Sequence, residues 1–167
     1  MAVVDRNGPI ADSWVRVADD VPVPQGASVI VSLARLKNDH NAVFAAAKAV
    51  GIEFTGDVNL DEVVPYLPQV ALVVARFTGM RDGRPFSIGR LLRERYGYKG
   101  DLRAAGPFIP DQVLFLLRVG FTTFDAEEGF SVEALKRSVA AYTAWYQRSA
   151  DRSTPTVVEL RHPESKS

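Results

Sequence analysis

The sequence predicts an α/β domain with a mainly parallel sheet of about five βα units. Short runs rich in β-branched residues alternate along the chain with amphipathic segments of helical period. The clearest strand, Val70–Phe77, is an almost continuous apolar run, as in strands that are buried on both faces of a parallel sheet. Two architectures fit this pattern, an open flavodoxin-like sheet and a partial β/α barrel, because 167 residues are too few for eight units.

The N-terminal residues predict a β hairpin ahead of the parallel sheet. Two extended segments, Ala2–Val4 and Trp14–Val17, flank the turn-forming Asn7-Gly8-Pro9. We expect these two segments to pair as a hairpin or an edge ribbon. The core strands expected after them are Ser28–Leu33, Ile52–Thr55, Val70–Phe77, Asp101–Ala105 and Phe121–Asp125.

Start and stop signals delimit the helices between these strands. Asn38, Asn59 and Ser131 are side chains that cap helix N-termini, and Pro110 suits a first helical turn. Gly51 and Gly120 are expected to end helices. The expected helices are residues 38–50, 59–65, 86–96, 110–119 and a helix after Ser131 with Val132, Leu135, Val139, Tyr142 and Trp145 facing inward.

The chain reads as one domain over residues 1–150, followed by a polar C-terminal tail over residues 151–167. Within the tail, Thr156–Leu160 is compatible with a short strand. The N-terminus lacks the apolar core of a signal peptide, and the longest apolar run, Val70–Ala75, is far too short to span a membrane. We therefore expect a cytoplasmic protein.

Composition and missing motifs exclude several functions. The 20 basic residues balance the 20 acidic ones, so neither nucleic acid nor a membrane is an expected partner. Cysteine is absent and the two histidines, His40 and His162, are far apart, which argues against iron–sulfur, zinc and other metal sites. No dinucleotide fingerprint, P-loop or nucleophile elbow occurs. We expect no cofactor.

The richest candidate for a binding site follows the clearest strand. Ligands collect at the carboxyl ends of parallel strands, and residues 78–87 join such an end to a helix N-terminus, where an anion is favoured. Arg81 and Arg84 add guanidinium donors for an oxyanion. In the alternative interpretation, Asp82-Gly83 forms a tight turn and the arginines pair with neighbouring acids.

Acidic residues near other strand ends are further candidates. Asp125 follows the last core strand and Asp111 begins a helix, beside Gln112. Either aspartate could serve as a general acid or base, or simply cap a helix.

Basic residues outnumber acidic ones between Arg76 and Arg103, and most of them are arginines. Arginine is the cation that suits bidentate pairing and protein interfaces. This segment therefore predicts a partner-binding face, with a merely solvated helix face as the alternative.

The segment Phe77–Gly106, FTGMRDGRPFSIGRLLRERYGYKGDLRAAG, resembles a bacterial family numbered 934 among domains of unknown function. Its members are often labelled as probable oxidoreductases involved in sulfite reduction. Asp111-Gln112, Arg118–Phe124, Trp14–Asp20 and Val29–Leu33 extend the resemblance over most of residues 14–125. This chain has Pro107 and Pro110 where the family usually has Asp and Arg, and Val119 where it often has Cys.

The resemblance implies a context in assimilatory sulfite reduction, because genes for the reductase typically lie nearby. It also marks candidate positions. Those for an anion site are Arg81, Asp82, Gly83, Arg84, Ser87, Arg103, Asp111 and Gln112, to which the strand-end argument adds Asp125. Those for a partner are Arg90, Arg93 and Tyr96, to which the arginine-rich face adds Arg95.

Three functions are compatible with these observations. The first is an accessory protein that binds sulfite reductase or its electron donor through the arginine-rich face. The second is an oxyanion-binding domain or enzyme with its site at the strand ends. A redox enzyme with its own flavin is a third.

Overall fold

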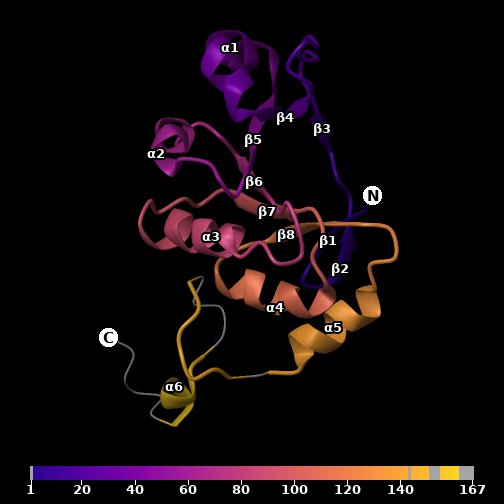
Figure 1. Ribbon diagram of the computed structural model, residues 1–167, viewed down its shortest axis with the longest axis vertical. Helices are drawn as coiled ribbons and strands as arrows, with labels where there is room; N and C mark the ends of the chain where they lie inside the picture. Colours follow the sequence, from indigo (N-terminus) through magenta and orange to yellow (C-terminus); the bar gives the residue numbers. More distant parts are fainter. Residues whose placement is uncertain (1, 143, 151–154, 162–167) are drawn as a thin grey trace.

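The computed structural model describes residues 2–142, 144–150 and 155–161 (Figure 1). These residues form one eight-stranded sheet with the strand order β2-β1-β8-β7-β6-β5-β4-β3. The strands are β1 (Ala2–Asp5), β2 (Gly8–Ile10), β3 (Trp14–Arg16), β4 (Ser28–Ser32), β5 (Ala49–Thr55), β6 (Leu72–Arg76), β7 (Asp101–Ala105) and β8 (Thr123–Ala126). Strands β3 to β8 are parallel, whereas β1 is antiparallel to β8 and β2 to β1. The prediction of an α/β fold with a mainly parallel sheet is confirmed.

Each parallel strand lies beside the strand that follows it in the sequence. A flavodoxin-like sheet instead reverses its strand order at a switch point and carries helices on both faces. Successive right-handed crossovers in one direction place all the connecting helices on the same face. Figure 1 shows helices that follow one another around the outer side of a curved sheet. The helices are α1 (Leu33–Ala46), α2 (Leu60–Val63), the 3₁₀ turn η1 (Val64–Tyr66), α3 (Arg84–Glu94), α4 (Pro110–Arg118), α5 (Val132–Ala140) and α6 (Val157–Arg161).

The short connection between β2 and β3 forces the sheet to curl. β2 ends at Ile10 and β3 begins at Trp14, so a fully extended chain separates these residues by at most about 14 Å. In a flat sheet of eight strands, the two edge strands would be about 34 Å apart. Because β2 and β3 are those edge strands, the sheet must bend until its edges approach one another.

The curl creates two separate hydrophobic clusters. The larger one fills the convex side, where strand residues such as Val73 and Phe124 pack on helix residues such as Leu36 and Leu116. The smaller one lies on the concave side, where Trp14 packs against Ile30, Leu72, Val74 and Ala105. A strand alternates its side chains between two faces, so apolar runs fill both clusters at once.

Trp14 fits on the concave side because β5 carries no side chain beneath it. A Cβ atom on Gly51 would lie 3.3 Å from the Trp14 ring and 3.2 Å from both Ile30 and Leu72. The glycine thus leaves room for the indole ring against the concave face of the sheet.

The structure corrects both ends of the first predicted helix and the start of the strand that follows it. Ser32 caps α1 by accepting a hydrogen bond of 2.9 Å from the Arg35 backbone N–H, so the helix begins before Asn38. α1 is kinked at Asp39, next to the predicted cap. Gly51 does not end a helix but lies inside β5, which starts at Ala49.

The prediction of an N-terminal β hairpin is confirmed, but the predicted partner of its first strand is wrong. β1 pairs with β2 around a turn in which the Asp5 carboxylate accepts hydrogen bonds from the backbone N–H groups of Asn7 and Gly8. Trp14–Arg16 instead joins the opposite edge of the sheet, parallel to β4. The turn closes earlier than expected because Asp5 holds it.

Two predictions near the C-terminus are corrected as well. Tyr142 lies beyond the end of α5 and is exposed rather than facing inward. Residues 157–161 form a helix rather than a strand, because Thr156 and Glu159 make reciprocal side-chain-to-backbone hydrogen bonds that cap it. The rest of the predicted tail, residues 151–154 and 162–167, lies outside the described residues.

We expect Trp14→Ala to lower the free energy of unfolding by about 2–3 kcal/mol, because it empties the concave cluster. The measurement is urea unfolding followed by circular dichroism. Val15→Ala is the matched control, since Val15 is the next residue of β3 and is 47% exposed. It should change stability by less than about 0.5 kcal/mol, and equal losses for the two variants would contradict the assigned role of Trp14.

Candidate functional site

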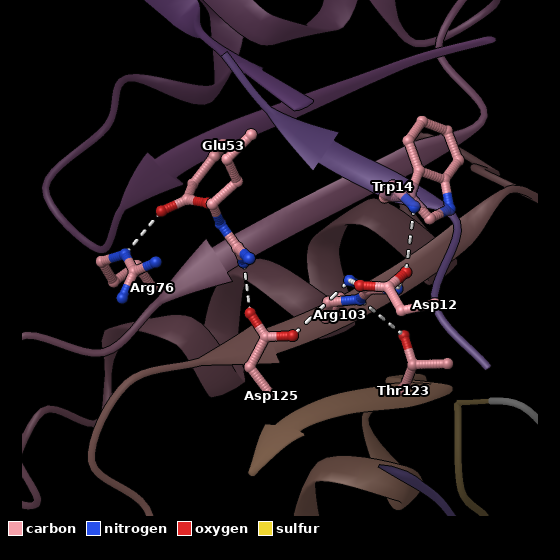
Figure 2. Close-up of polar contacts among 8 residues, drawn as sticks. Asp12, Trp14, Glu53, Arg76, Arg103, Thr123 and Asp125 are labelled. Atoms are coloured by element: carbon pink, nitrogen blue, oxygen red, sulfur yellow. Dashed lines mark hydrogen bonds and ion pairs between the residues drawn. The ribbon is translucent and has the colours of Figure 1, made fainter. Parts of the chain in front are cut away.

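Charged side chains interrupt the apolar strands on the concave side of the sheet. Arg16 lies on β3, Glu53 on β5, Arg76 on β6, Arg103 on β7 and Asp125 on β8. Strand register places all of them on the same face as Trp14 and Ile30. The curl of the sheet then turns these side chains toward one another (Figure 2).

These side chains form a chain of alternating charges, which we call the charge ladder: Asp12, Arg103, Asp125, Arg16, Glu53 and Arg76. Asp12 binds Arg103 with two hydrogen bonds of 3.0 Å, and its carboxylate also accepts a hydrogen bond of 3.3 Å from the Trp14 backbone N–H (Figure 2). The Arg103 guanidinium lies 3.5 Å from Asp125, which in turn pairs with Arg16.

Glu53 joins Arg16 to Arg76, the outermost member of the ladder. It accepts a hydrogen bond of 2.7 Å from Arg16 Nε and one of 2.5 Å from Arg76 Nε. The contact of Arg16 with Asp125 joins strands that four other strands separate in the sheet, so it exists only because the sheet is curled.

Burial is greatest at Arg103 and Asp125, in the inner part of the ladder, and lower toward both of its ends. The side chains of Arg103 and Asp125 are 3% and 2% exposed, whereas those of Arg16 and Arg76 are 38% and 34% exposed. A buried ion is tolerated only when opposite charges and hydrogen bonds replace its water shell. The inner pair meets this condition, with Thr123 Oγ1 within 3.4 Å of Arg103 Nε. The outer arginines remain in contact with solvent.

A cavity of about 630 Å³ lies beside the outer end of the ladder, at the carboxyl ends of β3 to β6. Arg16, Glu53 and Arg76 line it, together with the hydroxyl-bearing Ser32 and Thr55. Ser32 is the N-cap of α1, so the positive end of that helix dipole also points toward this region. The cavity thus combines guanidinium groups with a helix N-terminus.

The ladder sets the protonation of its acids. Burial raises the pKa of Glu53, but the hydrogen bonds and charges of Arg76 and Arg16 outweigh burial and hold this pKa below its ordinary value. For Asp12, burial likewise raises the pKa, and the hydrogen bonds and charge of Arg103 bring it below its ordinary value. Both carboxyl groups are therefore ionised at neutral pH.

In the predicted anion site, the β6–α3 loop, Arg84 is paired internally with Asp82. Asp82 Oδ1 accepts a hydrogen bond of 2.8 Å from Arg84 Nε, and its Oδ2 accepts one of 3.0 Å from Arg84 Nη2. These bonds, with help from Thr78, hold the pKa of Asp82 well below its usual range. Gly83 is the N-cap of α3, and Arg81 and Ser87 are exposed beside this pair. The alternative interpretation, a turn with an internal ion pair, describes Asp82 and Arg84.

Asp111 and Gln112 lie in the first turn of α4 and make hydrogen bonds to neighbouring segments. Gln112 Oε1 accepts a hydrogen bond of 3.1 Å from the Ile109 backbone N–H, and its Nε2 donates one of 3.3 Å to the Met80 carbonyl. Asp111 accepts a hydrogen bond of 2.9 Å from Ser138 on α5. The two residues tie α4 to the β6–α3 loop and to α5.

Of the predicted anion-site residues, Arg103 and Asp125 come together in the ladder, and the others lie on the surrounding loops and helix ends. Sequence reasoning missed Asp12, Arg16, Glu53 and Arg76. A signal for three of them exists, because each is a single charge inside a strand: Val-Arg-Val, Ile-Glu-Phe and Ala-Arg-Phe.

The predicted partner-binding arginines differ in their roles. Arg93 donates hydrogen bonds to the carbonyls of Gly120, Tyr98 and Gly100, at 2.7–3.0 Å, and so fastens α3 to the loops around β7 and β8. Arg90 makes an exposed ion pair of 2.8 Å with Glu94. Arg95 lies 5.4 Å from the centroid of the Tyr96 ring.

The sequence matches the family described as "Bacterial protein of unknown function (DUF934)" over residues 51–157. The chain belongs to this family. The DUF934 match includes Glu53, Arg76, Arg103 and Asp125, and it begins after Asp12 and Arg16. Searches of curated proteins and of solved structures found no match.

Two further observations concern the described part of this DUF934 protein. No group of three or more His, Asp or Glu side chains lies close enough together there to hold a metal ion. Among the same residues, no helix is both long and apolar enough to cross a membrane.

We expect Glu53→Gln to lower the free energy of unfolding at neutral pH by about 1–2 kcal/mol, because the amide cannot replace a charge shared by two arginines. The pKa of Glu53 is lower in the folded than in the unfolded protein, where it is about 4.3. Its contribution is therefore present above that value and lost as the pH falls through the folded pKa.

The measurement is urea unfolding of both proteins at about pH 7 and about pH 3. The difference between wild type and Glu53→Gln should shrink on acidification. Glu94→Gln removes an exposed carboxylate and serves as control, with a change of less than about 1 kcal/mol. A difference that stays constant across this pH range would rule out Glu53 as an ionised member of the ladder.

Proposed function

We propose that this protein binds a small oxyanion in the cavity at the carboxyl ends of β3 to β6. The proposal rests on the hydrogen bonding of Arg76, which uses only part of its guanidinium group. Its Nε donates to Glu53, while within the described part of the chain its two Nη atoms donate to no protein group. Arg16 similarly donates hydrogen bonds from Nε to Glu53 and from Nη2 to Asp125. Its Nη1 donates no hydrogen bond to the described residues.

Pairing with Glu53 holds these arginines in place and so makes them suitable for binding an anion. A guanidinium that is already held by one carboxylate loses less side-chain freedom when it binds a second anion. Both groups are about one-third exposed, so a ligand from solvent can reach them. The N-terminus of α1 at Ser32 adds a favourable dipole on the same side.

Location supports the same proposal. Enzymes and binding proteins built on parallel strands place their ligands at the carboxyl ends, where side chains from several strands converge. Here the cavity takes residues from four consecutive strands. The β6–α3 loop is a weaker candidate, because Asp82 and Thr78 engage both Nε and Nη2 of Arg84, whereas Arg76 uses Nε alone for its hydrogen bond to Glu53.

We expect sulfate, sulfite or phosphate to raise the melting temperature of the wild-type protein. A ligand at 100 times its dissociation constant stabilises by about 2.7 kcal/mol, which is about 5–10 °C for a chain of this size. Arg76→Gln should remove the shift, because it deletes the Nη donors. The measurement is a thermal-shift titration at constant ionic strength.

Arg81→Gln and Arg84→Gln are the controls for this titration, since they remove exposed arginines from the β6–α3 loop. They should leave the shift unchanged. If they remove it and Arg76→Gln does not, the loop is the anion site and the cavity is not. The absence of any shift in the wild-type protein would also overturn the proposal.

A second proposed function is an accessory role in assimilatory sulfite reduction, with sulfite reductase or its electron donor as partner. The family resemblance supplies this context. The outward side of α3 supports it, because Arg90, Leu91 and Arg95 are exposed there. A groove of about 1330 Å³ runs beside them, and Lys99 and the half-exposed Phe115 are among its lining residues.

We expect Arg90→Gln/Arg95→Gln to weaken binding to purified sulfite reductase, most strongly at low salt, because exposed charges act through a screened field. Arg93 is kept in this variant, since its loss would disturb the fold. Lys136→Gln/Arg137→Gln removes the same charge from α5 and is the control. Equal affinity of both variants and wild type would exclude the arginine-rich face as the partner site.

A further inference from the structure

The charge ladder is electrically neutral as a whole, because its three arginines face three acids. The net charge of the cavity at its outer end therefore depends on the charged lining residue that does not belong to the ladder, Asp19. An oxyanion bound to Arg76 adds a second negative charge to the same space. A ligand that also brings a positive charge would offset this repulsion.

The Asp19 carboxylate lies on the same side of the sheet as the guanidinium groups. Its Oδ1 accepts a hydrogen bond of 2.7 Å from Ser32 Oγ. Ser32 on β4 is directly across from Glu53 on β5 in the strand register, so both side chains point to the concave side. Neighbouring strands are about 4.8 Å apart. Because Glu53 holds Arg16 and Arg76, one small molecule can contact these arginines and Asp19 together.

Asp19 offers an accessible negative charge. Within the described part of the chain, no basic side chain forms an ion pair with it. Arg35 is nearby, but it donates to the backbone carbonyl of Asp19 and forms its ion pair, of 2.7 Å, with Asp39. Asp19 is exposed, so a cation can reach its carboxylate from solvent. An ammonium group complements it, since it carries the opposite charge and three hydrogen-bond donors.

We propose that the ligand is a small zwitterion, an amino acid or an aminosulfonic acid by class. Its carboxylate or sulfonate binds Arg16 and Arg76, and its ammonium group binds Asp19. This inference rests on the proposed function, since it assigns the ligand class of the same site. It adds that Asp19 selects for a positive charge on the ligand. An inorganic oxyanion then occupies only the guanidinium half of the site.

The test compares pairs of ligands that differ only in an amino group. Acetate is compared with glycine, propanoate with β-alanine, and ethanesulfonate with taurine, by calorimetry on the full chain at neutral pH and constant ionic strength. The aminated member of at least one pair should bind at least about tenfold more tightly, because it adds a charge-assisted hydrogen bond to Asp19. If no aminated member binds more tightly than its partner, the inference is overturned.

The variant Asp19→Asn tests the role of this carboxylate directly. It removes the attraction for the ammonium group and also a repulsion against anions. It should therefore abolish the preference for the aminated ligand, whereas sulfate should bind at least as tightly as it does to the wild type. Asp20→Asn is the matched control, because Asp20 is the next residue, is exposed and does not line the cavity. It should preserve the preference.

A preference that survives Asp19→Asn would overturn the inference and leave Asp19 as a support for the N-terminus of α1 through Ser32. Failure of the proposed function gives a different result. Sulfate binding that requires Arg76, without any preference for amines, overturns the zwitterion but keeps the oxyanion site. Absence of binding by every anion and every zwitterion overturns both. The ligand pairs on the wild-type protein decide the inference if Asp19→Asn does not fold.

Discussion

The three residues between β2 and β3 are the constraint on which the rest of this structure depends. They join the two edge strands of an eight-stranded sheet and are too few to cross a flat one. The sheet therefore curls, and its inner face becomes a concave surface. Side chains on strands that are distant in the sheet then lie opposite one another.

The charge ladder follows from this curvature. Along one strand, each of its members is a charge among apolar neighbours, which would be costly if it remained alone. Opposed across the concave side, the same charges alternate in sign and satisfy one another. The pairing is densest where water is excluded, around Arg103 and Asp125, and loosest at the outer end, where Arg16 and Arg76 border the cavity.

The strands and most helices could be predicted from the sequence, because local patterns determine them. The strand that starts at Ser28 and the cap at Ser131 are cases in which a run of β-branched residues and a capping residue gave the element correctly. Gly51 was assigned to a helix end because glycine commonly stops helices. The reason for that glycine is the ring of Trp14, a contact between residues that are far apart in sequence.

The candidate site was harder to predict for the same reason. Local patterns favour Arg81 and Arg84, because they follow a strong strand and lie at the start of a helix, whereas in the structure Arg84 is paired with Asp82. Arg16, Glu53 and Arg76 meet only after the sheet has curled, which no local pattern reveals. Single charges within apolar strands were the available signal, and period-two alternation could have placed them on one face.

The pairing of opposite charges in the charge ladder has an evolutionary consequence. Its three arginines and three acids cancel, and each inner member touches partners of opposite sign on both sides. A substitution that deletes one inner charge takes one counterion away from each of its two neighbours. Viable sequence change at these positions should therefore come as coupled exchanges, with Arg103 varying together with Asp12 or Asp125, even though Asp12 lies outside the segment by which the family is recognised.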